Sequence, residues 1–450
     1  MGKKQKTQKI VAAAVMGMNL VNSLSPMALA MQKCNELAAV PQPVQPQTEA
    51  QPLEYTVLPQ VLQDVERFIF STAEAQDIIE ISGDSKFEWT ISSGTQMIVN
   101  AGNGGAYEVL SGGTQIVNDG IGTATYFSSG ASQIVSGGTG SAAQVLAGAK
   151  QEIYGGNGMA YSVHKGASQI IYGGSGEVEY LQSNATQIIH EGAYGFVDGL
   201  GGIQEISGGS GSAYNVTKWD GTQIIDGGGS GHASFLFGTQ IVKDGIGSAY
   251  AIQSNVKQII CEGASGYTEE FRYGGTQVIL SGGYGEIEYM SNIGLQEISS
   301  GGTGYIVNLS GNAYGGGTQT INEGAQGTVE NLASGGEQLI NSGGLGIATI
   351  IKGGDQIIAG GTSEDAVVEK GIVYYKDNAG LINGMTMNGG EMLFNNDGKA
   401  YNVIGEFNFN SGIVDMAKKY DGGGNSQTYE SLTIESFNGK GGTLELNTDI

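Results

Sequence analysis

The residues that could carry chemistry in this chain are few and far apart. Its three histidines, His164, His190 and His232, are separated by much longer stretches than zinc ligands usually are. The two cysteines, Cys34 and Cys261, cannot build a disulfide framework, and neither belongs to a CxxC pair. We therefore expect no metal site and no cofactor.

Carboxylates are plentiful, but no group of them stands out as a catalytic site. There are 44 Asp and Glu against 20 Lys and Arg, which gives a formal net charge of −24. A site that cleaves acidic polysaccharides would need several Asp beside Arg or Lys, and Arg67 and Arg272 are the only arginines. We expect the chain not to be an enzyme. The negative charge also repels phosphate, which argues against nucleic-acid binding.

The first element of the chain is predicted to be an export signal. Residues 1–30 begin with several lysines, continue into an apolar stretch from Ile10 and end in the pattern Ala28-Leu29-Ala30. This order is typical of a cleaved secretory signal peptide, with Ala28 and Ala30 marking the cleavage site. Asn19 and Asn22 interrupt the apolar stretch, which leaves it too short to span a membrane well.

Two segments separate the signal from the main body. Residues 31–60 are rich in Pro and Gln and predict a linker. Residues 61–93 predict an N-terminal cap or lead-in, because apolar residues from Val61 to Ile69 have helix-like spacing. All 6 prolines lie before residue 60. The rest of the chain therefore suits a long sheet in which every backbone N–H donates.

One glutamine recurs with a period of approximately 18 residues through residues 94–362. A period this regular indicates a solenoid in which each copy forms one coil. The recurring glutamines are Gln96, Gln115, Gln133, Gln151, Gln169, Gln187, Gln204, Gln223, Gln240, Gln258, Gln277, Gln296, Gln319, Gln338 and Gln356.

Each copy predicts a strand, a glycine-containing turn, a second short strand and another turn. Ile or Val stands two residues after every glutamine, as in Val117 and Ile153, which indicates a buried position. The residue between the two accepts Glu152 and Glu205, so we expect that position to face water. Because strand side chains alternate, the glutamine shares the inward side with the Ile or Val.

These features predict an all-β fold, a parallel β-helix of roughly 18-residue coils that by analogy is right-handed. Glutamines stacked about 4.8 Å apart can bond amide to amide, and this ladder would satisfy their polarity inside the coil. Residues 363–429 fit the repeat poorly and are expected to form irregular coils. Cys261 falls where other copies carry Asn118 or Asp226, so we expect it to be exposed.

The repeat unit reads Gly-Gly-Thr-Gln-Ile-Val at 112–117 and Gly-Gly-Thr-Gln-Val-Ile at 274–279. It resembles the passenger repeats of AIDA-type autotransporter adhesins, and the resemblance covers residues 94–362. Residues 430–450 are similar to the start of a pertactin-like junction, which in that family leads to a C-terminal β-barrel translocator. The sequence stops at Ile450, so we expect the junction to be truncated and the barrel to lie outside this chain.

The resemblance implies a passenger at the bacterial cell surface, outer membrane or extracellular space. Its role would be an adhesin and self-association stalk in adhesion, autoaggregation and biofilm formation. Partners would be like passengers on neighbouring cells or host-surface ligands, and an outer-membrane β-barrel translocator not encoded in this chain. The family also implies heptose on outward Ser and Thr residues, here Thr95, Thr114, Ser132, Ser168, Thr186, Thr222, Thr239, Thr276 and Thr318.

Two other functions stay open on the sequence: a glycan-binding or polysaccharide-degrading β-helix, and a passive spacer. A row of exposed aromatic residues in the second strands could stack on sugars. Strand propensity alone explains the same residues without any ligand. The tyrosines in this row are Tyr107, Tyr126, Tyr161, Tyr180, Tyr214, Tyr250 and Tyr289.

Overall fold

The computed structural model describes nine stretches of the chain: 77–85, 88–216, 221–252, 256–271, 274–312, 315–377, 380–394, 400–415 and 431–445. The expected signal peptide with Ala28 and Ala30, the linker at 31–60 and the helix-like spacing at 61–69 lie outside these residues. The chain divides into two compact units, residues 35–179 and residues 180–450 with 1–34.

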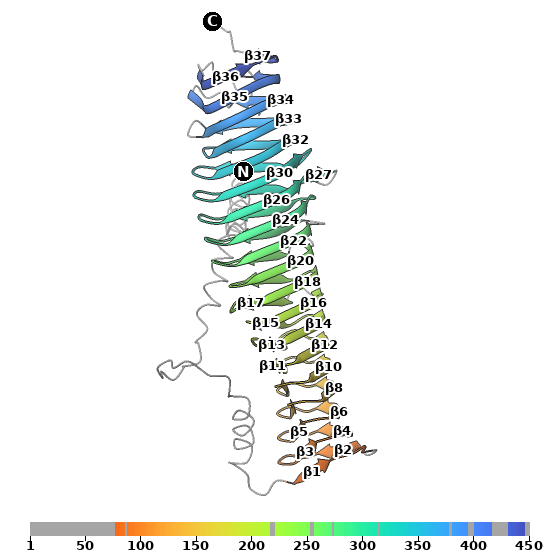
Figure 1. The fold of residues 1–450 in the computed structure, drawn as a ribbon. Coiled ribbons are helices and arrows are strands. Elements are labelled where there is room, and N and C mark those ends of the chain that lie inside the picture. The colour runs from red at the N-terminus through yellow and green to blue at the C-terminus, as the bar shows by residue number, and fades with distance from the viewer. Residues whose placement is uncertain are drawn as a thin grey trace, which may run out of the picture. The chain divides into compact units, whose positions relative to one another are not determined.

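The described residues form strands and turns and no helix, and successive coils pair in parallel. Each regular coil contributes a short strand of four or five residues and a longer strand of seven or eight (Figure 1). Short strands pair with short strands and long strands with long strands, one coil further along. The prediction of an all-β parallel β-helix with coils of about 18 residues is confirmed, and its handedness stays a prediction.

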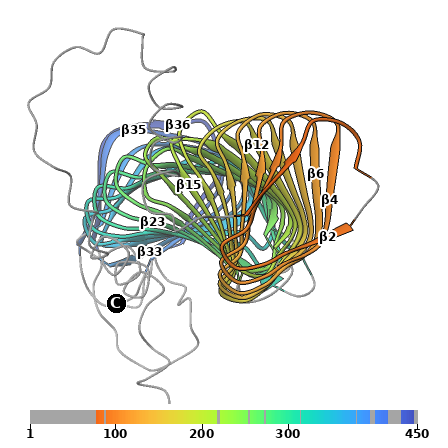
Figure 2. The ribbon, with the colours of Figure 1, turned by 90° about the horizontal axis from the view of Figure 1, so that it is seen from below.

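The N-terminal unit shows this pairing from the first described residues. Gly122 of one long strand pairs with Gly140 of the next, and Gln115 of one short strand pairs with Gln133. Figure 2 shows the long strands of these coils overlying one another, each turned slightly from the last. The short strands are β1 (Ile78–Ile81), β3 (Gln96–Val99), β5 (Thr114–Val117), β7 (Ser132–Val135), β9 (Lys150–Ile153) and β11 (Ser168–Ile171). The strands that alternate with them are β2 (Glu88–Ile91), which has only four residues, and the longer β4 (Asn103–Val109), β6 (Ile121–Phe127), β8 (Thr139–Val145), β10 (Asn157–Val163) and β12 (Ser175–Leu181).

The larger unit repeats the same coil. Its short strands are β13 (Thr186–Ile189), β15 (Ile203–Ser207), β17 (Thr222–Asp226), β19 (Thr239–Val242), β21 (Lys257–Ile260), β23 (Gly275–Ile279), β25 (Gly294–Ile298), β29 (Thr318–Ile321) and β31 (Glu337–Asn341). Its long strands are β14 (Tyr194–Leu200), β16 (Ser210–Val216), β18 (Ser230–Leu236), β20 (Ile246–Ile252), β22 (Ser265–Phe271), β24 (Tyr284–Met290), β26 (Thr303–Leu309) and β30 (Gln326–Ala333). The antiparallel pair β27 (Gly311–Asn312) and β28 (Gly315–Gly316) lengthens one coil, which explains the 23-residue spacing between Gln296 and Gln319.

The last coils are built from longer strands. They are β32 (Leu345–Ala359), β33 (Thr362–Asp377), β34 (Leu381–Phe394), β35 (Ala400–Asp415), β36 (Ser431–Gly439) and β37 (Thr443–Glu445). In these coils the register continues from Gln356 to Val373, Met392 and Val414, so apolar residues replace the glutamine. Tyr375 and Phe394 are fully buried and their rings stack with centroids 5.8 Å apart. The described residues of 363–429 thus continue the parallel pairing around an aromatic core, with irregularities of register such as the one between Asn383 and Met385.

The glutamine side chains form a one-way chain of hydrogen bonds inside the coils. In the N-terminal unit, Gln133 Nε2 donates to Gln115 Oε1 at 2.7 Å, and Gln151 Nε2 donates to Gln133 Oε1 at 2.5 Å. In the larger unit, the same bond recurs from Gln204 through Gln356 with N···O distances of 2.6–2.8 Å. Every amide nitrogen in these bonds donates to the glutamine one coil earlier in the sequence.

The glutamine amides also reach across the core to the long strands. Gln204 Nε2 contacts the carbonyl oxygen of Ser212 at 3.2 Å, and Gln240 Nε2 contacts that of Ser248 at 3.1 Å. Each amide N–H₂ has two hydrogens, so one serves the ladder and the other the opposite strand. The ladder therefore joins neighbouring coils along the stack and the two strands within a coil.

A glycine on the long strand makes room for this crossing. Every long strand from β4 to β26, and β30 and β32, has glycine as its second residue, facing inward. A Cβ on Gly285 would lie 2.4 Å from Ile279 Cδ1 and 2.6 Å from Gln277 Oε1. Sequence reasoning assigned glycine to turns and missed this role, although the recurrence of the residue was visible. The glycines are Gly104, Gly122, Gly140, Gly158, Gly176, Gly195, Gly211, Gly231, Gly247, Gly266, Gly285, Gly304, Gly327 and Gly346.

The ladder begins one coil later than predicted, because the first copy is shifted by one residue. Met97 pairs with Gln115 in the register, whereas Gln96 pairs with Thr114. Gln115 Nε2 accordingly lies 3.6 Å from the sulfur of Met97. The prediction that Gln96 belongs to the ladder is wrong. The spacing from Gln96 to Gln115 is 19 residues, which is within the range seen between other copies. The spacing alone therefore does not reveal that the first strand is shifted by one residue.

The C-terminal end of the ladder is closed by a hydroxyl group. Ser363 Oγ donates to Gln356 Oε1 at 2.9 Å, and Ser363 stands in register with Gly346, where earlier coils have glycine. Both groups are fully buried. The last acceptor of the ladder is therefore satisfied although Val373 follows in the register.

Two expectations about exposure on the short strands are wrong. The residue between the glutamine and the inward Ile or Val is buried in several coils, including Ile241 and Ile259, which are 2% and 0% exposed. These two side chains are partners on adjacent strands, so outward-facing branched residues cover one another. Cys261 is only 9% exposed, so its expected exposure is wrong as well.

A first prediction concerns the ladder. Replacing Gln223 by Met leaves Gln204 Oε1 without its donor and Gln240 Nε2 without its acceptor. Replacing Gln115 by Met removes the acceptor of only one ladder bond, the one that Gln133 Nε2 donates. It also extends the apolar start of the stack at Met97 by one coil. Since each buried group without a partner costs about 1–3 kcal/mol, Q223M should lower the free energy of unfolding about twice as much as Q115M. Urea unfolding followed by circular dichroism measures both, and equal losses would contradict the ladder's role.

A second prediction concerns the inward glycines. Gly285→Ala forces a methyl group against Ile279 and Gln277, and overpacking of this kind costs about 1–3 kcal/mol. Gly83→Ala is the matched control, because a Cβ there meets nothing within 4 Å. Thermal unfolding should show a lower midpoint for G285A and little change for G83A. A G285A chain as stable as the parent would mean that the glycine is not needed for close approach.

Candidate functional site on the outer strand faces

The long strands present their first, third and fifth residues to solvent. The burial of β4, which alternates over its first four residues and then leaves two outward before Val109, shows this arrangement. The fifth residue has no partner in the register of adjacent long strands. Ala160 pairs with Ala142, and the next pair is Ser162 with Gln144. The fifth residue is therefore held outward at a local irregularity of the strand, where a side chain can project freely.

The predicted tyrosines lie at the fifth or the sixth residue of their long strands. Tyr107, Tyr161, Tyr180, Tyr214, Tyr250 and Tyr289 are 37–52% exposed. Tyr126 is half-buried, and its ring meets that of Tyr107 edge to face with centroids 5.8 Å apart. The row is interrupted by coils with smaller or acidic residues, so it forms separate aromatic groups.

In the larger unit, many outward polar groups on the long strands bond to one another. His232 Nδ1 lies 2.9 Å from Ser248 Oγ, and Tyr267 donates to Glu288 Oε2 at 2.9 Å. Tyr284 donates to Glu286 at 2.9 Å. Burial, followed by the hydrogen bond from Tyr267 to Glu288, raises the pKa of Tyr267 to about 12. These tyrosines stay protonated at neutral pH and act as donors to the carboxylates.

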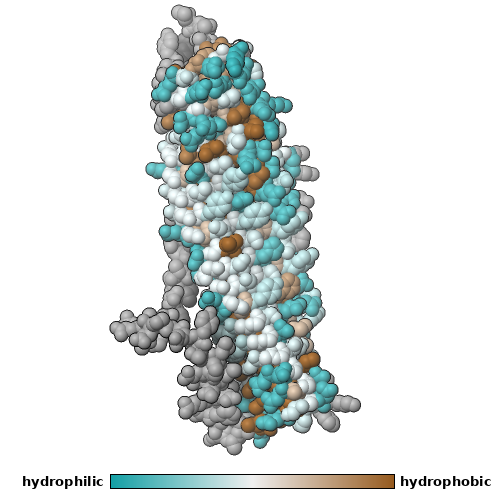
Figure 3. All heavy atoms as spheres, in the orientation of Figure 1, coloured by the Kyte–Doolittle hydropathy of each residue, from teal (hydrophilic) through white to brown (hydrophobic). Residues whose placement is uncertain are grey.

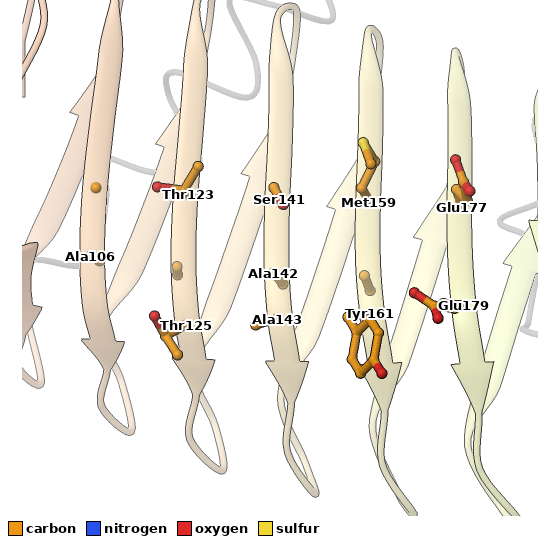
Figure 4. A pocket seen from close by; sticks show the side chains of 13 residues that line it. Ala106, Thr123, Thr125, Ser141, Ala142, Ala143, Met159, Tyr161, Glu177 and Glu179 are labelled. Carbon is orange, nitrogen blue, oxygen red and sulfur yellow. The ribbon is translucent and has the colours of Figure 1, made fainter.

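The N-terminal unit differs, because its long strands form a groove of about 480 Å³. The groove crosses β4, β6, β8, β10 and β12, and Figure 4 shows its side chains projecting from successive strands. Small residues line its middle, and larger ones stand toward β12. The lining consists of Gly105, Ala106, Thr123, Ala124, Thr125, Ser141, Ala142, Ala143, Met159, Ala160, Tyr161, Glu177 and Glu179.

The glutamine ladder supports the groove from inside. Gln115 Nε2 donates to the carbonyl of Thr123 at 3.1 Å, and Gln169 Nε2 contacts that of Glu177 at 3.3 Å. Gln151 makes the same contact with Met159 at 3.2 Å. The backbone beneath three lining residues is thus bonded to the buried core, which fixes the positions from which their side chains project.

The Ser and Thr residues expected to carry heptose lie on the short strands, not at the groove. Thr114, Ser132, Ser168, Thr186, Thr222, Thr239, Thr276 and Thr318 are half-buried and precede their glutamines. Thr95 is only 7% exposed, so its expected outward position is wrong. Its misplacement has the same cause as that of Gln96: the register matches Gln96, not Thr95, with Thr114. Heptose on the other positions stays a prediction.

At the same position before the glutamine, two later coils carry carboxyl groups that lie side by side. Glu337 on β31 and Asp355 on β32 are register partners, with Thr318 before them and Ile372 after them. Burial and then the neighbouring Asp355 raise the pKa of Glu337, while Lys376 opposes this shift. Burial also raises the pKa of Asp355. Both groups therefore hold their protons more tightly in the folded chain than in the unfolded one.

Within the described stretches, no group of three or more His, Cys, Asp and Glu residues is arranged to hold a metal ion. His164 instead bonds to Gln144 at 2.7 Å, and His232 to Ser248. A search of the same residues finds no helix long and apolar enough to cross a membrane.

Comparison with known proteins finds little. No protein-family model matches the chain, and no curated protein matches it. One solved structure that aligns with it is a crystal structure of a TibC-catalyzed hyper-glycosylated fragment of TibA, residues 55–350. The two are 19% identical, the alignment covers 71% of this chain and 96% of that chain, and the TM-score is 0.30. At this TM-score the likeness supports no conclusion about function.

The carboxyl pair generates a prediction about pH. Because the folded-state pKa values of Glu337 and Asp355 are raised, their contribution favours folding at low pH and is lost as pH rises through those values. Glu337→Gln should therefore raise the unfolding midpoint at pH 7. The gain should vanish below about pH 4, where carboxyl groups are protonated even in the unfolded chain.

The matched control for this prediction is Glu323→Gln, which removes the same charge from an exposed turn residue. Its unfolding midpoint at pH 7 should change much less than that of E337Q. If the two variants shift the midpoint equally, net charge rather than the contact between Glu337 and Asp355 is responsible.

Proposed function

We propose that this chain is a non-catalytic adhesin stalk that binds like chains on neighbouring cells or ligands on a host surface. The supporting observation is the set of tyrosines along the long strands, of which Tyr107, Tyr161 and Tyr289 are each at least 50% exposed. Tyrosine is enriched at protein interfaces because its rigid ring gives a large contact area with a polar tip. Repetition over many coils makes such a surface multivalent, which strengthens attachment without strong single contacts.

The interior of the coils supports a scaffold rather than an enzyme. In each regular coil the inward positions of the two strands include the ladder amide, an aliphatic side chain and a glycine. The amide and the aliphatic side chain pack directly against the glycine, so a substrate would not fit between the strands. Outside, Glu286 and Glu288 are hydrogen-bonded to tyrosine hydroxyls instead of facing each other as a catalytic pair. These features favour binding over catalysis.

The surface also favours weak contacts repeated many times. On the face in Figure 3, strongly apolar residues are scattered among polar and small ones instead of joining into one large patch. A polar interface of this kind contributes little per coil, so attachment would depend on many coils acting together. Self-association and biofilm formation are the expected consequences at the cell surface.

Export to that surface belongs to the same proposal. The supporting features are the signal-like segment at 1–30 and the resemblance of the repeats to autotransporter passengers. We propose that the chain reaches the outside of the cell with the help of an outer-membrane translocator. Once outside, its passenger coils would be free to meet neighbouring cells.

Surface display tests this function directly. Residues 31–450 are fused to a heterologous surface anchor in a bacterium that does not clump, and settling of the culture is measured. We expect faster settling, abolished by excess soluble passenger. Unchanged settling and no host-cell binding, with display confirmed by antibody, would leave only a passive spacer.

Salt dependence gives a further prediction. Chains of net charge −24 repel one another, and the screening length falls from about 30 Å at 0.01 M salt to about 8 Å at 0.15 M. Settling should therefore be faster at 0.15 M than at 0.01 M sodium chloride. Cells that display the anchor alone provide the control, because their own surface charge is screened in the same way. Faster settling at the lower salt would point to attraction between opposite charges.

A further inference from the structure

The groove of the N-terminal unit has polar side chains whose hydrogen-bonding groups are available to a ligand. Among the described residues, the side chains of Thr123, Thr125, Ser141, Glu177 and Glu179 make no hydrogen bond to one another or to a neighbour. At the same strand positions of the larger unit, comparable groups are bonded in pairs such as Tyr267 with Glu288. The groove therefore presents three hydroxyls and two carboxylates that the fold itself does not use.

The spacing of these groups follows the coils. Adjacent strands lie about 4.7–4.9 Å apart, and the groove crosses five successive long strands. One set of outward groups thus recurs at nearly the length of one sugar ring in a linear glycan. A linear oligosaccharide lying across the strands could place one ring over each coil and exchange hydrogen bonds with hydroxyls that both donate and accept.

An apolar platform stands beside the polar groups. Met159 is 46% exposed and Tyr161 is 52% exposed, and both project from β10 into the groove in Figure 4. The C–H face of a pyranose ring packs on an aromatic face, which adds contact area to the hydrogen bonds. A ring platform beside hydroxyl and carboxylate groups matches the mixed polar and apolar surface of a sugar.

Charge and backbone geometry limit the classes of ligand that the groove can bind. Glu177 and Glu179 line one end of the groove and no Lys or Arg lines it, so an anionic glycan would be repelled. The floor is the face of a parallel sheet whose backbone groups already pair between coils. A peptide therefore finds no free strand edge on which to form main-chain bonds.

We propose that this groove binds an uncharged linear oligosaccharide, with Tyr161 as the stacking platform. The inference rests on the proposed adhesive function and names the ligand class of one site. The ladder bonds to the carbonyls of Thr123, Met159 and Glu177 hold the floor in place before the ligand arrives. Such preorganisation lowers the cost of ordering a shallow surface site.

The test uses the purified full chain and a panel of uncharged linear hexasaccharides of glucose, galactose, mannose and N-acetylglucosamine, with hexagalacturonate as the anionic counterpart. Calorimetric titration should show saturable binding of at least one uncharged hexasaccharide and none of hexagalacturonate. Tyr161→Ala should weaken that binding about tenfold, as expected for loss of an aromatic contact. Ser141→Trp, which fills the middle of the groove from an outward position, should abolish it.

Tyr214→Ala is the matched control, because Tyr214 holds the same strand position on β16 with 48% exposure and lies outside the groove. It should bind the hexasaccharide like the parent. Unchanged urea midpoints of all three variants establish that folding is intact. If no uncharged hexasaccharide binds, or if Y161A and S141W bind as well as the parent, the proposal is wrong.

Two further measurements separate this inference from the proposed function. Hexalysine serves as a basic peptide probe, and its binding to the groove in the absence of any sugar binding would overturn the glycan assignment. Settling of cells that display S141W should match the parent if self-association uses other faces. Loss of settling with S141W, again without sugar binding, would identify a second copy of this chain as the occupant. If cells that display the parent settle faster but the parent binds no sugar, the glycan proposal is wrong and the proposed adhesive function is supported.

Discussion

The buried glutamine amide is the group on which the architecture of the coils depends. An amide in a core of Ile and Val is costly unless each donor and acceptor is bonded. The stack meets this demand with one bond to the preceding coil and one across to the long strand, as for Gln204 with Gln187 and Ser212. The first of these bonds is not available to a coil in isolation, because its acceptor belongs to the coil before it. The glutamine amide can therefore keep its ladder bond in the core only when the coils stack correctly.

Other features of the coil follow from this requirement. The amide can reach the opposite strand only if that strand comes close, so its second residue is glycine and the core is thin. In the described coils the two strands come so close that a Cβ on an inward glycine would meet side chains across the core, and the groove of the N-terminal unit lies on an outer face. The same cross-core bonds then support the backbone under the groove of the N-terminal unit, which connects a core constraint to the geometry of a surface site.

Outward chemistry varies while the inward pattern stays constant. In the larger unit, pairs such as Tyr284 with Glu286 use their hydrogen-bonding groups internally. In the N-terminal unit, small residues such as Ser141 alternate with the exposed Tyr161 and leave a hollow. One repeating scaffold therefore carries different surfaces on different coils, since a change in an outward side chain does not disturb the ladder.

The sequence by itself determined the fold class, the coil length and the inward side of most glutamines, because a period near 18 with Ile or Val two residues later has few structural solutions. It could not locate the one-residue shift that puts Met97 in place of Gln96, since spacing does not distinguish a shifted strand from a longer turn. Nor could it assign the inward glycines, because their role depends on Ile279 and Gln277 across the core. The groove was equally invisible: its residues are separated by a whole coil in sequence and become neighbours only through parallel stacking.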